Sequence, residues 1–160
     1  PSAPPAPTTP KEAELLAAIN KVWKEKYDAG AVVNKQLILN QDAVGIVRGY
    51  GRVFEEANET PHKWVKSDDD ILSDERHKFA EKMKKYGDNS FAGMVCDEDT
   101  EGMVALKYKY SCEDTVVQAF VEDLLNSNLN SSKAEFISIY CPVVQNVTYM
   151  TAAIFLNDKA

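Results

Sequence analysis

The chain has few of the residues on which most catalytic motifs depend. It holds two histidines and three cysteines among 160 residues. It contains no Gly-x-Ser-x-Gly elbow, no phosphate-binding loop and no Cys-x-x-Cys pair. No catalytic constellation can be assembled from what remains, and the sequence therefore favours a function in binding.

Basic residues are outnumbered, and long hydrophobic runs are missing. The 18 Lys and Arg residues stand against 25 Asp and Glu, which gives a formal net charge of -7. This balance argues against a nucleic-acid partner, because phosphate binding needs a basic face. No apolar run approaches the ~18 residues that a membrane-spanning helix requires. With 44% hydrophobic and 27% charged residues, the composition is that of an ordinary globular protein.

The length predicts a single domain with its own hydrophobic core. Residues 1–9 are rich in Pro, Ala and Thr and are expected to be a disordered lead, so the domain comprises residues 10–160. The lead resembles either a mature N-terminus left by processing or an artificial start.

The odd number of cysteines leaves two interpretations open. Cys96, Cys112 and Cys141 are either three buried thiols or one disulfide bond and one free thiol. In the second case Cys112 is expected near Cys141 or near Cys96. Three Asn-x-Ser/Thr triplets, which are compatible with a secreted glycoprotein, begin at Asn58, Asn130 and Asn146.

The first half of the chain is predicted to be helical in three segments. Thr9 and Glu12 have the spacing of a capping box, so a helix begins near Pro10, and Gly30 ends it. A second helix is expected over residues 40–57. A third lies between residues 73 and 87, after a polar loop.

The second predicted helix carries an unusual concentration of glycine. Gly45, Gly49 and Gly51 each cost about 1 kcal/mol relative to Ala in a helix interior. Three in one helix indicate a close approach to another helix or to a sheet, or a kink.

Strands dominate the expected structure of the second half. A turn over residues 88–91 and a short strand over 92–95 are followed by a strand over 103–110, in which apolar residues alternate with lysines. The segments 136–141 and 147–155 are β-rich, and the five-residue link between them predicts an antiparallel hairpin.

One helix is predicted between these strands. Ser111 and Asp114 have capping-box spacing, and an apolar stripe that includes Phe120 follows them. The order of elements fits an α+β fold, arranged as a three-layer α-β-α sandwich with a central antiparallel sheet.

Four segments carry a resemblance to a known family. They are Gly102-Met-Val-Ala, Thr115-Val-Val-Gln-Ala-Phe, Ile137-Ser-Ile-Tyr-Cys and Tyr149-Met-Thr-Ala-Ala-Ile-Phe. In order and spacing they resemble the C-terminal half of the CAP superfamily (cysteine-rich secretory proteins, antigen 5, pathogenesis-related 1), with Phe120 in place of the family's Trp. Asn20 and Trp23 are similar to its first helix, so the resemblance covers most of residues 13–155.

The resemblance implies a groove in which members often hold two His and two acidic residues, some of which bind a divalent metal. His62 corresponds to the first His and Glu113 loosely to one acidic residue. Met103 stands where a Glu is expected, and residues 126–132 contain no second His. One His and one carboxylate are too few for a zinc site, so neither metal nor cofactor is expected.

The resemblance also implies a secreted, non-catalytic domain. Its expected ligand is a lipid or sterol, with possible peripheral contact to a membrane, or else a partner protein. Tyr50, Phe54, Tyr108 and Tyr110 are the candidate apolar lining, although ordinary core packing explains the same residues. The alternatives are a hydrolase-like enzyme with a site rebuilt around His62, and a purely structural surface protein.

Overall fold

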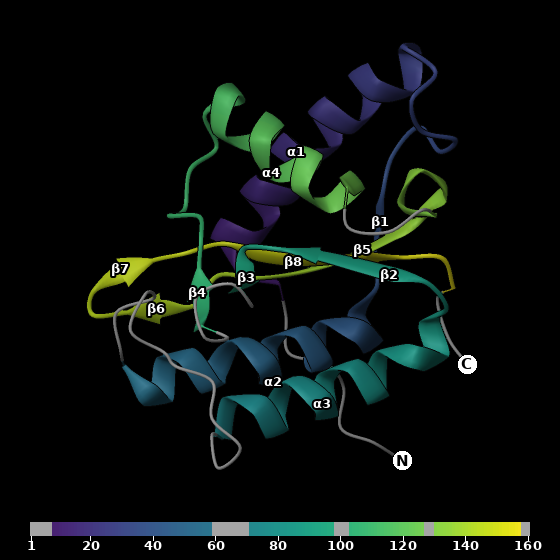
Figure 1. The fold of residues 1–160 in the computed structure, drawn as a ribbon. Helices are drawn as coiled ribbons and strands as arrows, with labels where there is room; N and C mark the ends of the chain where they lie inside the picture. The colour runs from purple at the N-terminus through teal and green to yellow at the C-terminus, as the bar shows by residue number, and fades with distance from the viewer. Residues whose placement is uncertain (1–7, 59–70, 98–102, 127–129, 158–160) are drawn as a thin grey trace.

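A computed structural model describes residues 8–58, 71–97, 103–126 and 130–157 of the chain. Its centre is a four-stranded sheet in the order β1-β5-β8-β2. The strands are β1 (Ile38–Leu39), β5 (Phe136–Tyr140), β8 (Thr151–Phe155) and β2 (Asn89–Ala92). Helices α1 and α4 lie over one face of this sheet, and α2 and α3 lie over the other (Figure 1). The α+β fold class is as predicted.

The four helices lie close to the predicted segments. They are α1 (Pro10–Asp28), α2 (Gln41–Ala57), α3 (Ile71–Met83) and α4 (Asp114–Asn126), and two short 3-10 helices span Lys84–Tyr86 and Ser131–Lys133. The capping box of α1 is present: the Thr9 hydroxyl accepts from the Glu12 amide, and the Glu12 carboxylate accepts from the Thr9 amide. Both ends of α1 therefore follow from local sequence.

Each face of the sheet has its own hydrophobic core, because side chains alternate between faces along a strand. On the α1–α4 side, Ile137, Ile139 and Ile154 pack against helix residues that include Trp23 and Phe120. On the α2–α3 side, the core comprises Ala43, Val47, Tyr50, Phe54, Phe79, Met83, Tyr86, Leu106, Val144, Tyr149, Ala153 and Phe155. The expectation that Phe120 lies in the core is confirmed, since none of it is exposed.

The sheet is mixed, and the prediction of an antiparallel sheet is wrong. β5 pairs with β8 and β8 with β2 in antiparallel register, but β1 runs parallel to β5. Strand β1 is held by the side chain of Asn20, which donates to the Leu37 carbonyl at 3.0 Å and accepts from the Leu37 amide at 2.8 Å. The residue that precedes β1 is thus anchored to α1 by a contact that no local pattern reveals.

The predicted turn over residues 88–91 is also wrong, because β2 occupies Asn89–Ala92. A second strand, β3 (Met94–Asp97), follows after a break at Gly93 and pairs with β4 (Met103–Leu106). Gly93 has φ +94°, and a Cβ there would lie 2.2 Å from the Met150 carbonyl oxygen. Only glycine fits this position, and it interrupts the strand predicted over residues 92–95.

The strand predicted over residues 103–110 is shorter than expected, and the link over residues 142–146 is more structured than expected. β4 ends at Leu106, and beyond it only Lys109 forms an isolated bridge, to Tyr149. Within the link, β6 (Val143–Val144) forms a small hairpin with β7 (Val147–Thr148), which takes the first residues of the strand predicted over 147–155. Its two turn residues, Gln145 and Asn146, both have positive φ, as a type I′ turn requires.

Candidate functional site

A groove between α2 and α3 is the candidate site. It has a volume of about 80 Å³ and is lined by Gly45, Ile46, Gly49 and Tyr50 of α2 and by Lys78, Phe79 and Lys82 of α3. On each helix the lining residues recur at intervals of three or four positions, so they share one face. The groove lies on the glycine-bearing helix that the sequence predicted to supply an apolar lining.

The floor of the groove is aromatic and fixed in place. The rings of Tyr50 and Phe79 stack with centroids 4.8 Å apart, and these residues are only 4% and 3% exposed. Phe54 packs edge-on against Tyr50, and Phe91 does the same against Phe79. Because four rings hold one another, the floor is a preformed apolar surface.

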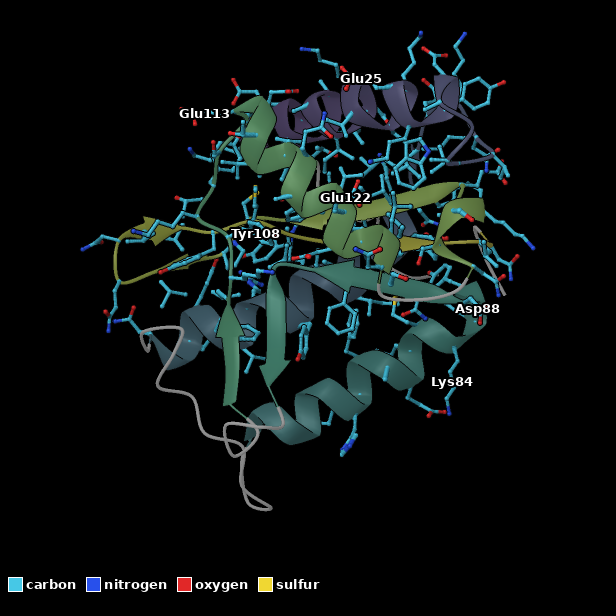
Figure 2. The ribbon with its side chains drawn as sticks, turned by 45° about the horizontal axis from the view of Figure 1, so that its top comes forward. Glu25, Lys84, Asp88, Tyr108, Glu113 and Glu122 are labelled. Carbon is cyan, nitrogen blue, oxygen red and sulfur yellow. The ribbon has the colours of Figure 1, made fainter. Side chains whose placement is uncertain are left out.

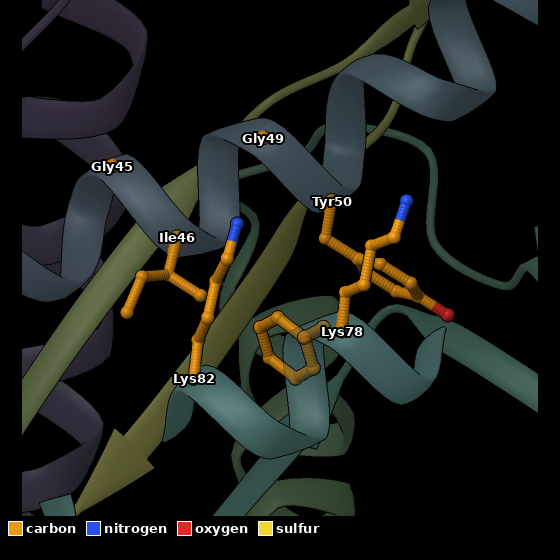
Figure 3. A pocket seen from close by; sticks show the side chains of 7 residues that line it. Gly45, Ile46, Gly49, Tyr50, Lys78 and Lys82 are labelled. Carbon is orange, nitrogen blue, oxygen red and sulfur yellow. The ribbon is translucent and has the colours of Figure 1, made fainter. Parts of the chain in front are cut away.

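The rim carries two cationic side chains. Lys78 and Lys82 reach from α3 toward α2, while Ile46 and Tyr50 point from α2 toward α3 (Figure 3). Both lysines are exposed, and none of the described residues that line the groove is acidic. Lysine stems cover apolar surface while their ammonium groups remain in water, so the groove joins an apolar floor to a positive rim.

The glycines of α2 serve two different purposes. A Cβ on Gly51 would lie 2.3 Å from Cδ2 of Tyr140, so Gly51 allows the close approach of α2 to β5. A Cβ on Gly45 or Gly49 would have no atom of the described residues within 4 Å. The expected close approach therefore accounts for Gly51 alone, and the other two glycines leave open space beside α2.

The four aromatic residues proposed as a lining do not meet at one surface. Tyr50 lines the groove, whereas Phe54 is completely buried beneath it. Tyr108 lies on the α4 side of the sheet (Figure 2), where its ring packs on Phe120 with centroids 5.2 Å apart. Tyr110 packs on the same side.

Both of those tyrosine hydroxyls have hydrogen-bond partners. Tyr108 donates to the Asp123 carboxylate at 2.5 Å, and Tyr110 donates to Glu14 at 2.9 Å. Burial raises the pKa of Tyr108, and its hydrogen bond to Asp123 raises it further. Burial likewise raises the pKa of Tyr110. These contacts tie the segment to α4 and α1.

The residues of the proposed tetrad are not brought into the groove. His62 lies outside the described residues. Glu113 is exposed just before α4 (Figure 2), where its amide donates to the Ser111 hydroxyl at 3.1 Å. That bond spans two residues, so Ser111 forms a local turn and not the expected capping box. In the described part of the chain, no cluster of three or more His, Cys, Asp or Glu side chains could hold a metal ion.

The thiols of Cys112 and Cys141 are free, so the disulfide considered between them is not formed. Cys96 lies in β3, where the placement of side chains is outside the description. Burial raises the pKa of Cys141 to about 12, and the negative charges of Glu12 and of an ionised Cys112 add to the effect. Cys112 and Cys141 are thus close enough to interact electrostatically without being bonded.

The three glycosylation candidates occupy different settings. The backbone of Asn58 is left-handed at the C-cap of α2, and its side-chain oxygen accepts from the Gln145 amide at 2.9 Å. Asn146 is exposed in the neighbouring β6–β7 turn. The Asn130 side chain donates to Asp88.

Sequence reasoning found half of the groove. Gly45, Gly49 and Tyr50 were visible as a glycine-rich helix with an aromatic residue. Lys78, Phe79 and Lys82 were missed as a set, although their one-turn spacing on the third predicted helix was a usable signal. The sequence alone does not show that this helix packs against α2.

No helix in the described part of the chain is both long and apolar enough to cross a membrane. A scan against protein-family models finds no match, and searches of curated proteins and of solved structures find no similar protein.

Proposed function

We propose that the chain is a divergent CAP-like domain that binds, without turnover, a single-chain anionic amphiphile such as a fatty acid in the α2–α3 groove. The observation that carries the proposal is the groove's combination of an aromatic floor with the exposed Lys82 at its rim. A carboxylate would lie at the Lys82 ammonium group, and its hydrocarbon chain would lie along the half-buried Ile46 and the exposed edge of Tyr50. Secretion and glycosylation belong to the same proposal: secretion rests on the family resemblance, and glycosylation rests on the triplets at Asn58, Asn130 and Asn146.

The dimensions of the groove favour a thin, flexible ligand. Its volume of about 80 Å³ is well below the ~300–1,000 Å³ of a pocket that encloses a drug-sized molecule. A rigid four-ring sterol would leave most of its surface outside such a groove, whereas an acyl chain can lie along it. Partial burial also implies weak binding, because affinity depends on how much of the ligand is desolvated in good contact.

Binding is favoured over catalysis by the chemistry of the lining. General acid–base catalysis needs a titratable group positioned at the reacting atoms. The described lining contains no His, Asp, Glu, Cys or Ser, and its lysines are exposed at the rim. These residues can attract and orient an anion, and no hydrolytic role for them follows from the geometry.

The test compares two soluble amphiphiles of equal chain length, dodecanoate and dodecyltrimethylammonium, in calorimetric titrations below their micelle concentrations. The protein's net charge of -7 would draw the cation non-specifically. If the local positive rim, and not the net charge, determines the affinity, the anion should bind saturably and more tightly than the cation. Dehydroergosterol, followed by its fluorescence, is expected to show no saturable binding.

Lysine variants locate the effect. Lys82→Ala should weaken dodecanoate binding by about 1.5- to 5-fold, the range for one exposed ion pair. Lys21→Ala, which removes an exposed lysine of α1 across the sheet, should leave it unchanged. Absence of saturable dodecanoate binding by the folded protein, or tighter binding of the cation, would overturn the proposal.

A further inference from the structure

We infer that the C-terminal part of α3 and the 3-10 helix after it dock on an anionic lipid bilayer, from which the groove takes its acyl chain. The docking surface, which we call the basic face, comprises Lys82, Lys84 and Lys85. This role rests on the proposed function and adds to it the partner that presents the ligand. Lys82 belongs to both sites, because it also lines the groove.

The basic face reverses the charge of the protein locally. Residues 77–88 hold four lysines against two acidic residues, Glu81 and Asp88, whereas the whole chain has a formal net charge of -7. Lys78 already interacts within the protein and is therefore left out of the basic face. The other three lysines are exposed. Each lysine held near an anionic leaflet adds to the attraction between protein and membrane.

The packing of α3 keeps these lysines in solvent. Phe79, Met83 and Tyr86 are buried and recur every three or four residues, so they form the inner side of the segment. Lys84 pairs with Glu81 at 2.7 Å, but both side chains are 72% exposed. An exposed pair of this kind contributes little to stability, so a lipid phosphate can replace the carboxylate at little cost.

The most acidic of the four helices lies on the far side of the sheet. α4 contains Asp114, Glu122 and Asp123 and no basic residue. Figure 2 shows Glu122 and Lys84 on opposite sides of the sheet. The two helix layers are roughly 20 Å apart, two helix diameters, whereas charges are screened over about 8–10 Å at ordinary ionic strength. Repulsion from α4 is therefore screened when α3 touches an anionic surface.

The chemistry of the basic face favours a bilayer over an acidic protein. Lysine is a hydrated point charge and lacks the planar fork by which arginine recognises a carboxylate in fixed geometry. Such charges suit a fluid surface whose headgroups rearrange around them. The groove lies between α2 and the helix that carries the basic face, so an acyl chain that leaves the docked bilayer meets the groove directly.

The experiment is co-sedimentation of the full chain with vesicles of phosphatidylcholine alone or of phosphatidylcholine mixed with phosphatidylserine. In salt of about 0.1 M, where the screening length is about 10 Å, only the mixed vesicles should bind the protein. A triple variant with Lys82→Gln, Lys84→Gln and Lys85→Gln should bind them at least about tenfold more weakly, because each lysine near an anionic surface is worth about fivefold.

α1, across the sheet, supplies a matched control. The triple variant with Lys11→Gln, Lys21→Gln and Lys24→Gln changes the net charge by the same amount and should bind the mixed vesicles as the native protein does. Each triple variant removes one lysine from an exposed ion pair and one from above a tyrosine ring. The two variants therefore differ chiefly in where the lost charges lie.

The outcomes separate docking from ligand binding. Equal binding to the two kinds of vesicle, or equal losses in the two triple variants, would overturn the docking. Binding of soluble polyglutamate but of neither vesicle would overturn it too, in favour of an acidic protein partner. If the native protein binds dodecanoate in solution but not the mixed vesicles, the docking alone fails. Binding to the mixed vesicles that depends on the basic face, without binding of dodecanoate, would support the docking and overturn the proposed function.

Discussion

Gly51 of α2 lies so close to Tyr140 of β5 that a methyl group on Gly51 would come within 2.3 Å of the tyrosine ring. The Tyr140 hydroxyl donates to the Glu55 carboxylate at 2.7 Å, and burial together with this hydrogen bond raises the pKa of Tyr140 to about 12. The Tyr140 ring is therefore held by the backbone at Gly51 and by the hydrogen bond of its hydroxyl to Glu55, and it cannot move aside freely. This contact fixes the depth at which α2 sits on the sheet.

We predict that Gly51→Ala destabilises the protein although alanine is the better helix former. Overpacking commonly costs about 1–3 kcal/mol, which exceeds the ~1 kcal/mol that alanine gains in helix propensity. Gly49→Ala, whose added methyl group would meet no atom of the described part of the chain, should instead raise stability by up to about 1 kcal/mol. Urea unfolding of both variants checks this, and equal effects at the two positions would contradict the packing described.

A buried ion pair connects α1 and α2. Arg48 donates to Glu12 at 3.2 and 3.4 Å, and Glu12 is only 3% exposed. Removing one partner from a buried pair leaves a charge without compensation, so Arg48→Met should cost about 3 kcal/mol or more. Combining it with Glu12→Gln should recover part of that loss, since the buried charge is then gone. A double variant that loses the full sum of the two single effects would rule out this coupling.

Acid should weaken the contact between α4 and residues 107–108. Burial tends to raise the pKa of Asp123, but hydrogen bonds from Lys107 and Tyr108 outweigh it and hold the pKa below its ordinary value of 3.8. The stabilisation is thus present above about pH 4 and is lost as the pH falls through the folded-state pKa. Because the Lys107 and Asp123 side chains are 49% and 36% exposed, solvent screens the pair, and we expect Asp123→Asn to cost no more than about 1 kcal/mol near neutral pH. The difference should vanish in acid, and a difference independent of pH would contradict this account.

The two described thiols should differ in reactivity. Cys112 is exposed, whereas burial raises the pKa of Cys141 to about 12 and leaves little of the reactive thiolate at neutral pH. Iodoacetamide added to the folded protein should therefore alkylate Cys112 well before Cys141, as peptide mapping by mass spectrometry would show. Faster modification of Cys141 would mean that this end of β5 is open to solvent.

The helices were predictable because their signals are local. Thr9 and Glu12 mark one helix start, and Asn40 caps another by accepting from the Ala43 amide. The strands were less predictable than the helices. The two residues of β1 are too few to show a period, and the chain just before them is anchored by Asn20, far away in the sequence. Gly93 divides β2 from β3 through a contact with Met150 that only the folded chain creates.

The candidate site divides in the same way. The glycines of α2 were visible in the sequence, but which of them face the sheet and which face open space depends on the rotation of the helix. Lys78 and Lys82 can be recognised as part of the groove only when α3 is known to pack beside α2. Tyr108 and Tyr110 were expected in the same lining as Tyr50 because of the family resemblance, yet they pack on the opposite face of the sheet.

The most direct measurement of the central claim is a titration of isotopically labelled protein with dodecanoate, followed by amide chemical shifts in NMR spectra. We predict progressive, saturable shifts at Gly45, Ile46 and Gly49 and at the α3 amides from Lys78 to Lys82, with little change in α1 and α4. Shifts confined to the Tyr108–Tyr110 segment and α4, or no shifts at all, would contradict the assignment of the α2–α3 groove as the binding site.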